Sequence, residues 1–256
     1  MRAHVTPLTR FCLCSGIACV VSLLFITCSE DTTLLDPGSD RLRATVTDID
    51  GNVYQTVKIG DQWWMAENLR VARYRNKDPI PIVTDSVCWA CLSTGACCIY
   101  GNETSPEPSY GRLYNWYAVK CPRGLAPEGW HVPTDEEWKS LEMYLGMSQS
   151  MADTEYYRGT NQGGMLKGTG NSLWKVPNAG ATNEYGFSAL PGGGRSAVTI
   201  QGIGKFVYRG EIATFWSSTQ KNAHNAWFRI LSYERADIYR LSSDKQLGFA
   251  VRCVKD

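Results

Sequence analysis

The side chains with the widest range of chemistry in this chain are its cysteines, of which there are ten among 256 residues. Three lie in an apolar segment near the amino terminus, and a fourth, Cys28, closes that segment. The remaining six are Cys88, Cys91, Cys97, Cys98, Cys121 and Cys253. An even number of thiols in an oxidising compartment indicates disulfide bonds, of which six thiols can form at most about three. We therefore expect these six to be paired.

Four of these cysteines follow one another closely, in the pattern Cys88-x2-Cys91-x5-Cys97-Cys98. They could form one or two disulfides within a loop, or two thiol pairs could supply the four tetrahedral ligands of a zinc ion. An oxidising compartment favours disulfides, and adjacent cysteines make awkward ligands for one ion. The pairing inside this cluster stays open.

Cys28 lies where a hydrophobic leader gives way to a polar, acidic stretch. Arg2 and Arg10 precede an apolar run over residues 17–26, which is the layout of an exported leader with a processing site. The junction resembles the lipobox of bacterial lipoproteins, whose cysteine receives a diacylglyceryl group and whose new amino terminus is acylated too. We expect residues 1–27 to be a signal peptide, removed before Cys28.

A lipidated, flexible stalk is expected over residues 28–43, because this segment is polar and rich in turn-forming residues. Several acyl chains would hold the protein on a membrane stably. Glu30 and Asp31 follow the lipid site directly, which favours the outer membrane and exposure at the cell surface. Phe25 and Thr27 depart from the commoner residues of the lipobox, so ordinary secretion or a retained signal anchor is the alternative.

Composition favours one globular domain after the leader. The chain is 43% hydrophobic and 20% charged, which allows one sizeable core. Removing the two leader arginines leaves 24 of the 26 Lys and Arg residues against 25 Asp and Glu, a formal charge of −1. No basic run accompanies the aromatic residues, so we expect no nucleic-acid partner. No later segment reaches the ~20 apolar residues that span a bilayer.

Catalytic residues are scarce. After the leader the only histidines are His131 and His224, and neither has a neighbour in the sequence that suggests a triad or a metal site. The segment Trp216-Ser217-Ser218-Thr219 is typical of a strand and lacks the Gly-x-Ser-x-Gly pattern of a nucleophile elbow. We expect the protein not to be an enzyme and to need no cofactor.

Aromatic residues are the candidates for ligand binding, because rings offer much contact area at little cost in side-chain entropy. Nine tryptophans and thirteen tyrosines are present. The candidate binding residues are Trp89, Tyr100, Trp174, Tyr185, Trp227 and Tyr233, although each taken singly is more often a core residue. A structural calcium held by loop oxygens such as those of Asn183 and Glu184 is a further alternative.

Hydrophobic periodicity predicts strands at both ends of the domain and two helices between them. The strands are expected at residues 44–49, 53–59 and 62–65, and later at 205–208, 214–217, 226–231, 237–241 and 248–254. The helices are expected over 111–119 and 134–145, the second with a capping box formed by Thr134 and Glu137. Residues 76–110 show no sustained period and are interpreted as a long cross-linked loop. This pattern indicates an α+β domain over residues 44–256.

Six ordered sequence blocks resemble the Fibrobacter succinogenes major paralogous domain. They are Asp48–Tyr54, Gln62–Leu69, Gly111–Trp116, Gly129–Thr134, Phe215–Thr219 and Gly248–Cys253. The resemblance implies a C-type-lectin-like fold, similar to that of formylglycine-generating enzymes, in which two helices flank antiparallel sheets and the first and last strands pair. It also implies a Cys121–Cys253 disulfide, with residues 76–110 as a cysteine-rich insertion.

Together these features predict a non-catalytic lipoprotein of the cell envelope that binds an extracellular glycan or protein through its loop face. A structural or assembly component of the envelope is one alternative. A degenerate enzyme of the formylglycine-generating kind is another, in which Cys253 would have to be a free thiol.

Overall fold

The first ordered sheet grows from the alternating pattern near the amino terminus. The computed structural model describes residues 34–35, 42–104, 110–199 and 202–256, so the leader, Cys28 and most of the stalk lie outside the described residues. Three consecutive antiparallel strands confirm the predicted meander: β2 (Leu42–Thr47), β3 (Val53–Ile59) and β4 (Gln62–Met65). The β2–β3 turn is fixed by Asp48, whose Oδ1 accepts from the backbone N–H groups of Asp50 at 2.9 Å and Asn52 at 3.0 Å.

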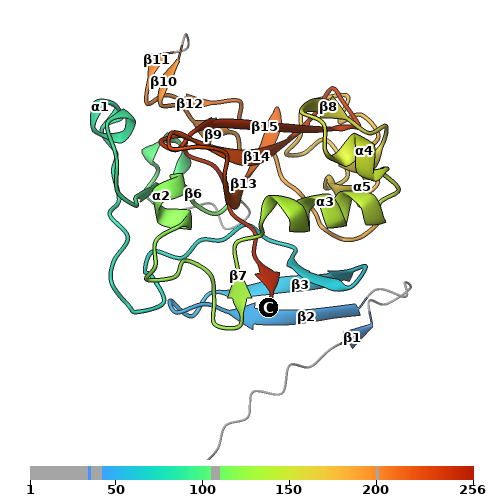
Figure 1. Ribbon diagram of the computed structural model, residues 1–256, viewed down its shortest axis with the longest axis horizontal. Helices are drawn as coiled ribbons and strands as arrows, with labels where there is room; N and C mark the ends of the chain where they lie inside the picture. Colours follow the sequence, from blue (N-terminus) through green and yellow to red (C-terminus); the bar gives the residue numbers. More distant parts are fainter. Residues whose placement is uncertain (1–33, 36–41, 105–109, 200–201) are drawn as a thin grey trace, which may run out of the picture. The chain divides into compact units, whose positions relative to one another are not determined.

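The last strand of the chain completes this sheet. β16 (Val254–Lys255) lies between β4 and β7 (Trp130–His131), with Val254 opposite both Trp64 and His131. Together with β1 (Leu34–Leu35), the strand order is β1-β2-β3-β4-β16-β7. The two ends of the domain are therefore joined in one sheet at the lower side of Figure 1.

The second sheet is antiparallel and comes from the carboxy-terminal half. Its order is β13 (Ile212–Gln220), β14 (Asn225–Ser232), β15 (Ile238–Asp244) and β8 (Tyr156–Arg158). Three two-stranded pairs accompany it: β5 (Cys97–Cys98) with β6 (Leu113–Tyr114), β9 (Gly194–Arg195) with β12 (Phe206–Val207), and β10 (Val198–Thr199) with β11 (Gly202–Ile203).

One helix of appreciable length bridges the two sheets. α3 (Asp135–Tyr144) begins with the predicted capping box, in which Thr134 Oγ1 accepts from Glu137 N and the Glu137 carboxylate accepts from Thr134 N. Its apolar face packs against both sheets, because Trp138 lies 4.9 Å from the ring of Trp64 in β4 and 5.7 Å from that of Phe215 in β13. This cluster is one of the two large apolar clusters of the core.

The remaining helices are short. They are α1 (Ser86–Ala90), α2 (Trp116–Val119), α4 (Gln149–Ala152), α5 (Gln162–Leu166) and the 3-10 turn η1 (Tyr100–Asn102). None of the helices in the described part of the chain is long and apolar enough to span a bilayer.

The predicted α+β, C-type-lectin-like fold with two flanking helices is wrong. The structure is β-rich, with 33% of residues in strands and 15% in helices. The helix expected over residues 111–119 is reduced to four residues, because Leu113 and Tyr114 pair with β5 instead. Asn115 then starts α2 late, with its side-chain oxygen accepting from Ala118 N at 3.0 Å.

The prediction of a disulfide-linked domain is also wrong. The free cysteines are Cys88, Cys91, Cys97, Cys98, Cys121 and Cys253. Cys97 and Cys98 are consecutive residues of β5 and so face opposite sides, each within a different apolar cluster. Burial raises the pKa of the Cys97 thiol to about 11 and that of Cys98 to about 12. Cys88 and Cys91 are exposed at α1, away from the buried pair.

A buried arginine, and not a disulfide, fixes part of residues 76–110. The Arg195 guanidinium lies between the rings of Trp89, at 4.5 Å, and Phe206, at 4.8 Å. Its nitrogens donate to the carbonyls of Val83 at 2.6 Å and Thr84 at 2.7 Å. These bonds satisfy loop carbonyls that have no partner in a regular strand or helix.

A buried ion network joins α3 to the second sheet. Asp135 and Glu142 of α3 both accept from Arg229 of β14, at 2.7 and 2.6 Å. Arg240 of β15 pairs with Asp135 at 2.6 Å, and Arg158 of β8 with Glu142 at 2.5 Å. Burial raises the pKa of Asp135, but hydrogen bonds and positive charge from Arg240 and Arg229 outweigh burial, so its pKa lies below the ordinary value.

We predict that Arg229→Met lowers the free energy of unfolding by about 3–5 kcal/mol, because it leaves two buried carboxylates without their shared partner. Urea-induced unfolding measures the change. The control is Lys175→Met, which breaks the exposed Lys175–Glu211 pair and should cost less than about 1 kcal/mol. An equal effect of the two substitutions would contradict the central role of the network.

Candidate functional site

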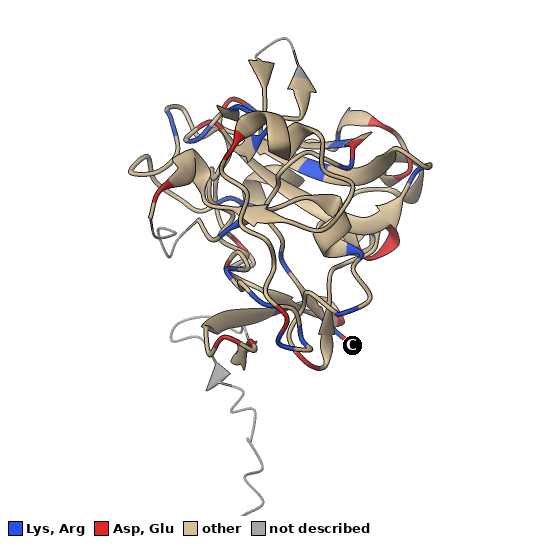
Figure 2. Ribbon diagram, turned by 90° about the vertical axis from the view of Figure 1, so that its left-hand side faces the viewer, with Lys and Arg blue, Asp and Glu red and all other residues tan. Residues whose placement is uncertain are grey.

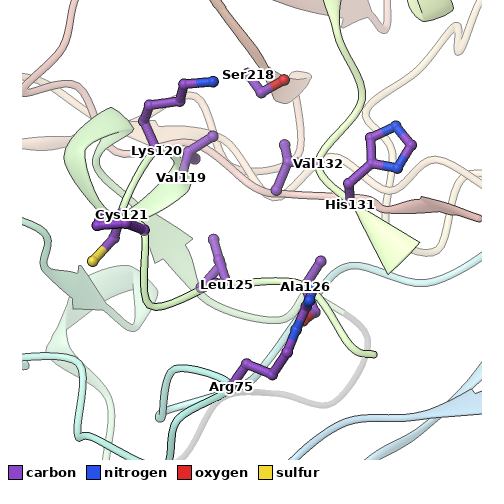
Figure 3. A pocket seen from close by; sticks show the side chains of 11 residues that line it. Arg75, Val119, Lys120, Cys121, Leu125, Ala126, His131, Val132 and Ser218 are labelled. Atoms are coloured by element: carbon purple, nitrogen blue, oxygen red, sulfur yellow. The ribbon is translucent and has the colours of Figure 1, made fainter. Parts of the chain in front are cut away.

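A cleft of about 500 Å³ opens beside the end of α2. Its walls come from four places in the chain: the segment around Arg75, the end of α2 with the segment that follows it, strand β7 with Val132, and β13 (Figure 3). The lining residues are Arg75, Val119, Lys120, Cys121, Pro122, Gly124, Leu125, Ala126, His131, Val132 and Ser218. The volume is within the ~300–1,000 Å³ typical of ligand pockets.

The cleft combines an apolar floor with a polar rim. Val119, Leu125 and Val132 are buried, whereas Lys120 is exposed. Figure 3 shows the Lys120 side chain extending toward Ser218, whose own position is fixed by its backbone N–H donating to Pro133 O at 2.8 Å. Within the described residues Lys120 makes no ion pair, so its ammonium group and the Ser218 hydroxyl can meet a ligand.

Arg75 holds one wall of the cleft in place. Its Nε and one terminal nitrogen donate to Ala126 O at 3.2 Å, and the same terminal nitrogen reaches Pro127 O at 3.1 Å and Trp130 O at 3.0 Å. Its own backbone N–H donates to Gly124 O at 2.8 Å. The wall is therefore shaped before any ligand arrives.

His131 borders the cleft but is occupied on both ring nitrogens. Nδ1 lies 2.6 Å from an oxygen of Asp256, and Nε2 lies 2.8 Å from an oxygen of Glu137. Partial burial lowers the pKa of His131, but the hydrogen bonds and charges of the two carboxylates outweigh burial and raise it above 6.5. Engaged in this way, the imidazole favours its charged form and has no free nitrogen for proton transfer.

Cys121 lines the same cleft, half-buried. The guanidinium Nε of Arg123 donates to its sulfur at 3.2 Å. Burial raises the pKa of Cys121, but the hydrogen bonds and charge of Arg123 outweigh burial, so the pKa lies below 9.0. The sulfur points away from His131 in Figure 3. Cys253, in contrast, is fully buried in the core, and burial raises its pKa.

The structure does not bring the six predicted aromatic residues together. Trp89 and Trp174 are buried, at 0% and 2% exposure, in different apolar clusters. Tyr100 packs beside Trp89 against Phe206, at a ring distance of 5.1 Å. These three residues are packing residues, and Tyr100 alone of them is partly exposed.

The other three aromatic candidates lie in the carboxy-terminal half. Tyr185 and Tyr233 are partly buried against the cluster around Trp174. Trp227 is covered on its ring by Arg240 at 3.8 Å and Lys221 at 4.7 Å. No shared aromatic platform results among the described residues.

The structure gives little support to the predicted calcium site at Asn183 and Glu184. Asn183 uses its side-chain amide on Ser188, accepting from the backbone N–H at 2.8 Å and donating to Oγ at 2.9 Å. In the described ranges no three His, Cys, Asp or Glu side chains form a group that could hold a metal ion.

The residues of the cleft were missed by sequence reasoning. Lys120 and Ser218 are 98 positions apart in the chain, and no periodicity or motif links them. Arg75 lies between the strand expected at residues 62–65 and the loop expected over 76–110, in a segment for which no element was predicted. Of the cleft residues, Cys121 was considered only as a disulfide partner, and His131 and Ser218 only as catalytic candidates that were rejected.

Comparison with known proteins identifies the family. The model of the Fibrobacter succinogenes major domain matches residues 57–255, which is more than half of the chain. The chain belongs to this family. Neither the curated proteins nor the solved structures yield a match. In this Fibrobacter succinogenes major domain, β7, β16 and the cleft all fall within the matched residues.

We predict that His131 stabilises the folded protein at low pH and stabilises it less as the pH rises. Because its pKa is higher in the folded protein, the contribution is complete below about pH 6.5 and is lost as pH rises through the folded value. The stability gap between the native protein and His131→Gln should therefore be widest near pH 6 and shrink toward pH 9. Its size should stay below about 1 kcal/mol, since the side chain is 36% exposed.

Thermal or urea unfolding at a series of pH values measures this gap. His224→Gln is the matched control, because His224 is exposed in a turn and has no carboxylate partner among the described residues. A His131→Gln gap that grows with pH would contradict the two-carboxylate arrangement.

Proposed function

We propose that this Fibrobacter succinogenes major domain is the globular part of a lipoprotein of the cell envelope, carried to the outer membrane and exposed at the surface. The support is the leader pattern that ends at Cys28 and the acidic residues that follow it. Lysine and arginine positions are interspersed with aspartate and glutamate positions on the domain (Figure 2). That mixed distribution suits a tethered domain that meets the membrane through lipid and not through a basic face.

We further propose that the domain binds an extracellular ligand in the cleft without converting it. The observation that carries this proposal is the position of the exposed Lys120 side chain, which extends toward Ser218 over the apolar floor of the cleft. The cleft has the volume of a typical ligand pocket. A few polar groups over an apolar surface are typical of binding sites. This location replaces the aromatic loop face, whose tryptophans are largely buried or covered.

Catalysis is not favoured by the arrangement of the cleft. The two nucleophile candidates are Ser218 and Cys121, and the only histidine nearby is engaged by Glu137 and Asp256. A nucleophile needs a base within hydrogen-bond reach, and among the described cleft residues no hydrogen bond joins the Ser218 hydroxyl or the Cys121 sulfur to a histidine or a carboxylate. The buried Cys253 likewise offers no reactive thiol for a degenerate formylglycine-generating enzyme.

We predict that mass spectrometry of the native protein finds a lipid-modified amino terminus at Cys28. Cys28→Ser should abolish the modification and release the protein from the membrane fraction, because the lipid is the proposed anchor. An unmodified mature terminus, or an intact leader on a protein in the cytosol, would refute the proposed location.

We predict that Lys120→Ala weakens binding on an array of glycans and extracellular proteins by about fivefold or more, the value of one exposed charge contact. The control is Lys58→Ala, which removes an exposed lysine from β3, outside the cleft. Both variants should unfold at the same temperature as the native protein. Binding that survives Lys120→Ala would move the site elsewhere, and an array with no binding at all would favour a structural role in the envelope.

A further inference from the structure

A second pocket adjoins the cleft. It has a volume of about 240 Å³ and is lined by Thr47, Asp48, Ile49, Val71, Arg75, Leu125, Ala126, Pro127 and Glu128. Arg75, Leu125 and Ala126 line both pockets. The two pockets therefore adjoin at these three residues, where Arg75 donates to the carbonyls of Ala126 and Pro127.

The two pockets carry opposite free charges. Lys120 is the exposed cation of the first, and Glu128 is the exposed acid of the second. Neither makes an ion pair within the described part of the chain. The other charged groups are already engaged: Arg75 donates to backbone carbonyls, and Asp48 accepts from the β2–β3 turn and from the Tyr54 hydroxyl at 2.5 Å.

No Phe, Trp or Tyr side chain is among the described residues that line the two pockets. Sugar recognition commonly relies on the broad contact area of aromatic rings, which this site lacks. The floor is instead aliphatic, with Val119 and Leu125 in the first pocket and Ile49 and Val71 in the second. Aliphatic floors with a charge at each end fit a polypeptide, whose alternating side chains can be apolar or charged.

We infer that the two pockets form one bipolar cleft that binds an extended polypeptide segment, with an acidic side chain at Lys120 and a basic side chain at Glu128. The inference rests on the proposed function, since it names the ligand class of the same site. Charge complementarity at both ends sets the direction in which the segment lies. Reversing both charges of the cleft must then reverse the preferred order of charges in the ligand.

The test uses a library of peptides whose two termini are chemically blocked and carry no charge. Each peptide contains one aspartate and one lysine, in either order and at varied spacing. The native protein should enrich one order of the two charges. Lys120→Glu or Glu128→Lys alone should weaken binding of the enriched peptides by about fivefold. The double variant should bind as well as the native protein but enrich the opposite order.

Enrichment without a preferred charge order, or an order that the double variant does not reverse, would overturn the inference. The variants alter exposed residues, and equal melting temperatures confirm that all of them are folded. The glycan and protein array shows whether a failed peptide test rejects only the polypeptide ligand or also the proposed binding function. Glycan binding that depends on Lys120, with no peptide enrichment, would sustain a binding cleft and reject the polypeptide ligand. No dependence on Lys120 in either assay would reject both.

Discussion

Five charged side chains at the centre of the molecule tie its one long helix to its second sheet. Asp135 and Glu142 present carboxylates from α3, and Arg229 donates one hydrogen bond to each. Taking such charges out of water costs several kcal/mol per ion, and the cost is offset only when each group has well-placed partners. The geometry of α3 against the sheet is therefore narrowly defined. Ser218 lies in β13 of this sheet, and His131 contacts Glu137 of this helix, so the network holds together the two elements that carry or contact these cleft residues.

Arginine side chains donate hydrogen bonds to loop carbonyl groups in this fold, a role that backbone N–H groups fill in regular helices and strands. Much of the chain runs in irregular segments whose carbonyl groups need donors. Arg75 donates to carbonyl groups of the segment at the cleft wall, and Arg195 donates to those of the segment before α1. Arg252 does the same for the segment after Phe187, where it donates to Ser188 O at 2.9 Å. A guanidinium group has five N–H donors in a fixed plane, so one side chain can anchor several turns of loop.

The sequence predicted those features that depend on neighbours along the chain. The meander at β2–β4, the capping box of α3 and the buried face of Trp138 follow from patterns a few residues long, and all are present. The ion network joins residues about ninety positions apart, such as Asp135 and Arg229, and no local pattern announces it.

The errors have the same origin. Asp135, which follows the capping residue Thr134, also binds the distant Arg229, and no local pattern indicates that contact. The cysteines were counted as if their number implied their pairing, but Cys97 and Cys98 face opposite sides of a strand, and packing, not count, decides whether two thiols meet. The cleft residues depend on how α2 and β13 approach one another, which only the assembled fold specifies.

The position of β16 has a consequence for how the chain reaches this fold. Because Val254 lies between Trp64 and His131, the first sheet stays split into two unjoined pieces until the final residues have been synthesised. A partial chain exposes two unpaired strand edges and cannot close its core. The first sheet therefore reaches its full strand order only when the last residues of the chain are available to pair.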